Sequence, residues 1–169
     1  YETPLCNSNN PGETEMKKIL ATIFATFLLF SAQTGFAADN GTADEAKALV
    51  EAAIAKIKSD GKENAFKAFE SKNGGFIDRD LYIFVFDMAG LTLSHGTYKG
   101  LIGKNLVKMN LKDPDGKKFI DAFIATAKTK GEGWVDYKWV NPTTKKIEQK
   151  SSFVKKVDST MFVGCGIYK

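Results

Sequence analysis

Apolar positions from residue 42 onward recur first with the spacing of a helix. They fall three or four residues apart, as on one helical face, at Ala46, Leu49, Val50, Ala53, Ile54 and Ile57. Thr42 followed by Glu45 makes a capping-box pattern at the start of this helix, and Asp60-Gly61 ends it. The pattern predicts a shorter helix over residues 62–72, ended by the sequence NGG, and another over residues 114–130.

Five further apolar segments are typical of strands, over residues 81–87, 91–95, 134–140, 147–155 and 161–168. The first, LYIFVFD, is too short and too aromatic for an independent helix. The second places Leu91, Leu93 and His95 on one face. Short turns between neighbouring strands imply an antiparallel sheet, and the helices must cover at least one of its faces to bury their apolar stripes.

This order of elements predicts an α+β fold. We expect a PAS-like, five-stranded antiparallel sheet with a long N-terminal helix and connecting helices. A cystatin-like or cone-shaped sheet is the alternative, because both also begin with a helix and finish in antiparallel strands. Periodicity alone does not separate these architectures.

The start of the chain has the order of a secretory signal peptide. Met16 is followed by two lysines, a 12-residue apolar run and a small-residue segment that ends at Ala37. The run is shorter than the roughly 20 residues that span a bilayer. We therefore expect residues 16–37 to be a signal peptide, cleaved after Ala37, and the single domain 38–169 to be periplasmic. An uncleaved leader that tethers the domain at the inner membrane is the alternative, and residues 1–15 are interpreted as an upstream or cloning-derived segment.

Charge and cysteine content narrow the function classes. Without residues 1–37, the chain loses two lysines and three glutamates from its 24 basic and 20 acidic residues, which leaves a net charge of +5. The charges are interspersed, so we expect no nucleic-acid partner but a mild attraction for anions. Cys165 is then the one remaining cysteine, which excludes an internal disulfide. A single histidine without a second histidine or a cysteine pair predicts neither a metal site nor another cofactor.

Six motifs carry a family resemblance, in the order LYIFVFDMAGLTLSHG, LIGKNL, DPDGKKFI, GEGWVDYKWVNP, KSSFVKKV and GCGIY. Together they resemble the single Cache domain of type 2, over about residues 44–168. Such domains are extracytoplasmic sensors of small molecules in bacterial chemoreceptors and kinases. The resemblance implies a pocket between the curved sheet and the connecting loop and helix that accepts a short carboxylate or another small polar metabolite. It points to five ligand-binding residues, namely Tyr82, His95, Tyr137, Trp139 and Lys150.

The strand pattern adds a physical reason for an anionic ligand. Alternation places Tyr137 and Trp139 on the inner side of strand 134–140. A hairpin turn centred between residues 144 and 145 would set Lys150 opposite Trp139 and Ser152 opposite Tyr137, whereas a one-residue slip would turn Lys150 to solvent. A buried ammonium is costly unless an anion compensates it. We therefore expect a small organic anion under Tyr137 and Trp139.

Other residues leave alternatives open. His95 is interpreted either as a core histidine bonded to backbone or as a ligand contact. Arg79, between two aspartates, favours a structural salt bridge over a ligand contact. Gly164 and Gly166 leave room for a ligand or, preferably, an approaching helix. Cys165 is expected to be a small buried apolar residue.

These features favour a non-enzymatic binding module. Because the chain ends at Lys169 without a second apolar segment, we expect a stand-alone periplasmic Cache protein that binds a small organic anion. It would serve signalling or chemotaxis through a partner such as a membrane sensor kinase or chemoreceptor. The alternatives are an interaction or structural module with a vestigial pocket and a hydrolase-type enzyme that uses His95 and Cys165.

Overall fold

The computed structural model describes residues 40–169. The predicted segment 1–15, the predicted signal peptide and its cleavage site lie outside the described residues. Within residues 40–169, no helix has both the length and the apolarity needed to cross a membrane.

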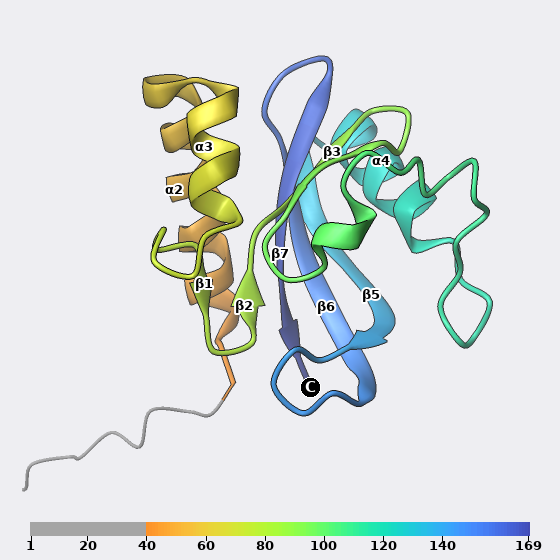
Figure 1. Ribbon diagram of the computed structural model, residues 1–169. Helices are drawn as coiled ribbons and strands as arrows, with labels where there is room; N and C mark the ends of the chain where they lie inside the picture. Colours follow the sequence, from red (N-terminus) through yellow and green to blue (C-terminus); the bar gives the residue numbers. More distant parts are fainter. Residues whose placement is uncertain (1–39) are drawn as a thin grey trace, which may run out of the picture. The chain divides into compact units, whose positions relative to one another are not determined.

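One antiparallel sheet of five strands forms the centre of the fold, in the order β4-β3-β7-β6-β5 (Figure 1). Its strands are β3 (Phe84–Asp87), β4 (Thr92–His95), β5 (Glu132–Val140), β6 (Ile147–Lys156) and β7 (Met161–Tyr168). A small two-stranded sheet, β1 (Ile77–Asp78) with β2 (Leu81–Tyr82), precedes it. The predicted five-stranded antiparallel sheet is confirmed. The expected strand 81–87 is divided into β2 and β3.

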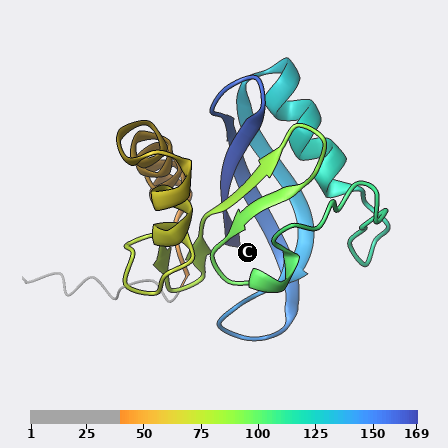
Figure 2. The same cartoon turned by 45° about the horizontal axis from the view of Figure 1, so that its top comes forward.

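Helices cover both faces of this sheet. The helices α2 (Ala43–Asp60) and α3 (Lys62–Phe69) lie against one face, and α4 (Phe119–Thr129) lies against the other (Figures 1 and 2). A short 3₁₀ helix, η2 (Lys99–Leu101), lies in the long loop between β4 and α4. The α4 helix begins later than residue 114 because the Asp113 carboxylate accepts hydrogen bonds from the backbone of Asp115 and Lys117, which holds this segment as a loop.

Two hydrophobic cores result from the alternation of side chains along the strands. Val85 and Val163 point toward α2 and α3, while their neighbours Phe84 and Phe162 point toward α4. The core on the α4 side is rich in aromatic rings, and several of them stack or meet edge to face. It is this aromatic core that contains the predicted site.

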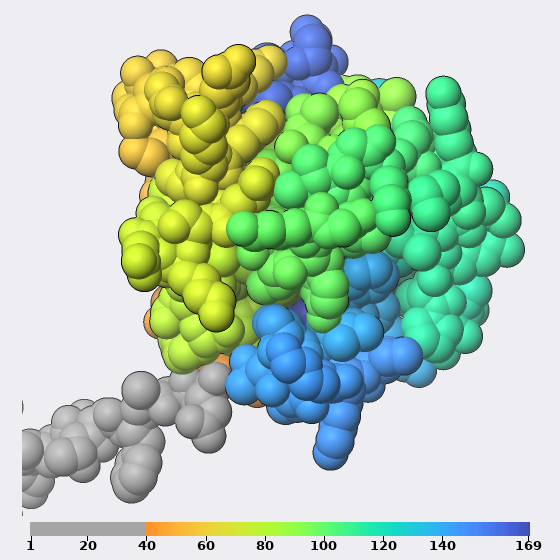
Figure 3. Space-filling view, in the orientation of Figure 1, coloured from red at the N-terminus to blue at the C-terminus, as the bar shows by residue number. Residues whose placement is uncertain are grey.

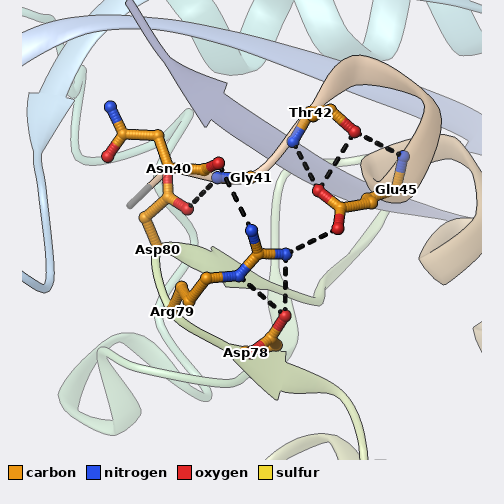
Figure 4. Close-up of polar contacts among 7 residues, drawn as sticks. All are labelled: Asn40, Gly41, Thr42, Glu45, Asp78, Arg79 and Asp80. Atoms are coloured by element: carbon orange, nitrogen blue, oxygen red, sulfur yellow. Dashed lines mark hydrogen bonds and ion pairs between the residues drawn. The ribbon is translucent and has the colours of Figure 1, made fainter. Parts of the chain in front are cut away.

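Polar contacts fix the start of α2 to the turn between β1 and β2 (Figure 4). Arg79 forms ion pairs with Asp78 at 2.9 Å and with Glu45 at 2.7 Å, so the expected structural salt bridge is confirmed for Asp78. The buried Asp80 carboxylate accepts a hydrogen bond from the Gly41 amide at 2.6 Å instead. These contacts join the N-terminal helix to the strand that carries Tyr82.

The predicted capping box is present at the start of α2. The Glu45 amide donates to the Thr42 hydroxyl at 3.2 Å, and the Thr42 amide donates to the Glu45 carboxylate at 2.7 Å. Replacing Thr42 with Ala is expected to lower the free energy of unfolding by about 1 kcal/mol, because the Glu45 amide loses its acceptor. Urea denaturation measures the loss. Thr42→Ser should retain most of the stability, and equal stability of the Ala and Ser variants would contradict the role of the cap.

Strand β4 contains a β-bulge that the prediction for residues 91–95 did not include. The pairing of β3 with β4 shifts between Val85 and Phe86. As a result Leu93 packs toward the core on the α2 side, whereas His95 lies on the α4 side. The prediction that Leu91, Leu93 and His95 share one face is wrong, because the extra residue of a bulge breaks the alternation.

The register of the β5–β6 hairpin also differs from the prediction. Tyr137 pairs with Lys150, whereas the predicted turn placed Lys150 opposite Trp139. The turn is centred one residue earlier than expected, since the Asn141 amide donates to the Lys146 carbonyl and closes the loop. A shift of two residues in the pairing leaves every side chain on the same face, so Lys150 still points toward the α4 side.

Candidate functional site

A small cavity lies within the aromatic core between the sheet and α4. Its volume is about 10 Å³, which is about the space for one water molecule. Four of the five predicted site residues line it: Tyr82, His95, Tyr137 and Trp139. The remaining walls come from β3, α4 and the long loop, through Phe84, Phe86, Leu101, Leu106, Phe119, Ile120 and Phe123.

The long loop closes this side of the molecule. In the space-filling view, residues 96–118 (green to teal) cover the front of the domain, and the turn of residues 141–146 (blue) lies next to them (Figure 3). Leu101 and Leu106 of this loop contribute to the wall of the cavity. The helical stripe of α4 was evident from sequence, but the periodicity of a loop does not indicate which of its residues turn inward.

Lys150, the fifth predicted residue, lies one layer behind the cavity wall. Its side chain is fully buried, with 0% of its surface exposed. The ammonium nitrogen Nζ donates to the Tyr82 hydroxyl at 2.7 Å and to the Tyr168 hydroxyl at 3.1 Å. It also lies 3.9 Å from the centre of the Tyr82 ring. Lys150 therefore contacts the wall of the cavity through Tyr82.

Glycines in β7 make room for this arrangement. A Cβ atom on Gly166 would lie 2.4 Å from Cε of Lys150 and 2.2 Å from the Ser152 hydroxyl oxygen. A Cβ atom on Gly164 would lie 2.3 Å from the ring of Phe84. The expectation of a helix over these glycines is wrong, because neighbouring side chains of the sheet fill the space.

Burial dominates the electrostatics of Lys150. It lowers the pKa of this ammonium to about 7, although Cys165 and Asp80 act in the opposite direction. None of the ion pairs formed within residues 40–169 includes Lys150. The hydrogen-bond partners of the buried amine are therefore neutral hydroxyl groups, and the ammonium loses its proton as the pH rises through about 7.

Tyrosine hydroxyls extend the polar network from Lys150 to the end of β5. Tyr168 donates to the Val140 carbonyl at 2.8 Å, and Tyr98 donates to the same oxygen at 2.9 Å. Tyr137 shares a 3.0 Å hydrogen bond with Ser152. Burial raises the pKa of Tyr82, Tyr137 and Tyr168, so these hydroxyls keep their protons.

His95 is a core histidine bonded to backbone, one of the two interpretations that the sequence left open, and its ring also lines the cavity. Its Nδ1 accepts hydrogen bonds from the amides of Tyr98 at 3.1 Å and Thr97 at 3.4 Å, while its ring lines the cavity. Burial, followed by the positive charge of Lys150, lowers its pKa to about 3. The imidazole is therefore neutral, and because Nδ1 is an acceptor, its hydrogen lies on Nε2.

The hydrolase alternative does not fit this geometry. Cys165 packs in the core on the α2 side, whereas His95 lines the cavity on the α4 side. Burial raises the pKa of the Cys165 thiol to about 12, which leaves almost no thiolate at neutral pH. The alternative of a His95–Cys165 pair is wrong because alternation puts the two residues on opposite faces of the sheet. No cluster of three or more potential metal ligands occurs within the part of the chain that the structure describes.

Comparison with known proteins places these features in a family. The family described as single Cache domain 2 matches residues 10–169. The sensor histidine kinase MctS of Rhizobium johnstonii is 42% identical over 91 residues, which are 53% of this chain and 19% of MctS. The chain thus spans about a fifth of the length of this relative.

Solved structures share the fold. A methyl-accepting chemotaxis protein from Vibrio parahaemolyticus has a TM-score of 0.63 at 21% identity, over 90% of this chain and 95% of that one. The periplasmic sensor domain of a chemotaxis protein has a TM-score of 0.59 at 24% identity, over 90% and 96%. A Cache chemosensory domain studied for carboxylic acid recognition has a TM-score of 0.58 at 19% identity, over 95% and 99%. At these identities the likeness establishes the fold.

Proposed function

Because this chain belongs to the single Cache domain 2 family, a family of sensory ligand-binding domains, we propose that residues 38–169 bind a small organic anion in the cavity beside α4. Binding would take place in the periplasm and would be passed to a membrane sensor kinase or chemoreceptor. The relatives named above, a sensor histidine kinase and chemotaxis proteins, support this kind of partner.

The buried Lys150 carries the proposal for an anion. An ammonium without exposure or ion pair is unfavourable in a protein interior, and an anion nearby would offset this cost. The Tyr82 hydroxyl accepts a hydrogen bond from Lys150 at 2.7 Å and donates its own hydrogen to the Tyr168 hydroxyl at 3.5 Å, a long bond that a carboxylate would replace with a stronger one. The Nε2 hydrogen of His95 supplies a second donor on the cavity wall. A carboxylate between these two donors would lie within the field of Lys150.

The walls favour a small ligand with an apolar part. Phe84, Phe119 and Phe123 line the cavity beside the two polar donors. At about 10 Å³ the cavity has no room for even acetate as it stands, so side chains must shift on binding. Short monocarboxylates need the smallest such shift.

A thermal-shift screen tests the proposal. The screen compares acetate, propionate, lactate, pyruvate, short dicarboxylates and amino acids, with acetamide as the uncharged counterpart of acetate. A ligand at 100 times its dissociation constant is expected to add about 2.7 kcal/mol to the free energy of unfolding. If acetamide raises the transition temperature and no anion does, the anionic site is excluded. If no compound does so at high millimolar concentration, the vestigial pocket is the better interpretation.

A further inference from the structure

We infer that Trp139 sets the upper size limit of the ligand by closing the cavity against a second, open groove. This inference rests on the proposed binding of a small organic anion. It assigns Trp139 a role in specificity beyond contact with the ligand.

Two cavities meet at this indole. Trp139 lines the small cavity of about 10 Å³ beside α4. It also lines an open groove of about 320 Å³, together with Pro114, Lys138, Val140 and Ile147 among others. Trp139 is the one residue common to both sets of lining side chains. The indole is therefore the partition between them.

Aromatic neighbours hold the indole in this position. Its ring lies edge to face with Phe119 at 5.4 Å and with Tyr98 at 5.8 Å between ring centres. Tyr98 is fixed in turn by its hydrogen bond to the Val140 carbonyl. Because the partition is braced on both sides, a ligand that outgrows the cavity must displace the indole against these contacts.

The chemistry of the groove identifies what would enter if the partition were removed. Ile147 is 58% exposed and, with Val140, offers an apolar surface to an alkyl chain. The Asp113 carboxylate in the groove accepts hydrogen bonds from backbone amides, including that of Lys138 at 3.0 Å. The groove thus suits the tail of a straight-chain carboxylate whose head group remains beside Tyr82 and His95.

Replacing Trp139 with Ala tests the inference. The binding of straight-chain carboxylates from acetate to octanoate is measured by calorimetry for the natural protein and for the variant. In the natural protein, affinity should fall beyond the shortest members of the series. In Trp139→Ala, affinity should rise about fourfold for each further methylene group that enters the groove, up to the length at which the groove is filled.

Trp134→Ala is the matched control. Trp134 lies on the opposite face of the same strand, against Phe153. Its replacement therefore removes an indole of the same size without opening the cavity. This control should keep the size preference of the natural protein. If Trp139→Ala does not fold, Trp139→Leu carries the test, because leucine preserves part of the packing and shortens the partition.

The outcomes separate this inference from the proposed function. If the natural protein binds short carboxylates and the Trp139 variants keep the same chain-length order, the role of Trp139 is overturned and the anion site stands. If neither protein binds any carboxylate, both fail. A shift toward longer chains in the Trp139 variants, absent from Trp134→Ala, supports the inference.

Discussion

Replacing Lys150 with Met is expected to weaken the binding of a small organic anion about ten- to more than a hundredfold. Methionine retains most of the buried stem beside Gly166 and removes the ammonium. The lost attraction between the ammonium and an anion on the far side of Tyr82 corresponds to roughly 1.5 to 3 kcal/mol at an effective dielectric constant of about 20. Calorimetric titration with the strongest ligand from the thermal-shift screen measures the change.

The same substitution should leave the ligand-free domain equally or more stable. It removes a buried ammonium, and the Tyr82 and Tyr168 hydroxyls keep their hydrogen bond to each other at 3.5 Å. Between pH 7 and 10.5 the folded state binds fewer protons at Lys150 than the unfolded state, so this group's contribution to stability rises with pH. The gain from Lys150→Met should therefore be largest below pH 7.

Lys156→Met provides the control for charge alone. Lys156 is exposed near the end of the same strand, so its loss changes the net charge equally without touching the cavity. Its affinity for the anion should match that of the natural protein. If Lys150→Met also binds the anion with unchanged affinity, Lys150 does not contribute to the site.

Affinity for the anion is expected to fall up to tenfold per pH unit above pH 7 and to be constant between about pH 5.5 and 6.5. The pKa of Lys150 is about 7 in the free protein, so above this pH the amine must take up a proton when the anion binds. Below this pH the proton is already bound. A bound anion favours the ammonium and raises the pKa of Lys150 in the complex.

The other groups around Lys150 do not titrate in this interval. The pKa of His95 is lowered to about 3, and those of Tyr82, Tyr168 and Cys165 are raised. Titrations at pH 8 in two buffers of different ionisation enthalpy should show uptake of nearly one proton per anion. Uptake should be absent from any residual binding by Lys150→Met. Equal affinity from pH 6 to pH 9 in the natural protein would contradict the coupling.

The sequence by itself determined the elements and the side of the sheet on which the candidate site lies. The helix over Ala43–Asp60 and its capping box follow from contacts within a few residues, as do the three long strands β5, β6 and β7. The placement of Tyr137 and Lys150 on one face depends only on a period of two, which the two-residue difference in register preserved. Local chemistry was sufficient for these features.

Only the tertiary structure decided which residues of the candidate site line the cavity and which lie behind its wall. The bulge that separates Leu93 from His95 depends on pairing between two strands, and the burial of Lys150 behind Tyr82 depends on the space left by Gly166 in a third. The partition at Trp139 exists because a loop and α4 pack against the edge strand β5. Such contacts join residues far apart in the chain, so their geometry follows from packing of the whole domain, and no local periodicity encodes it.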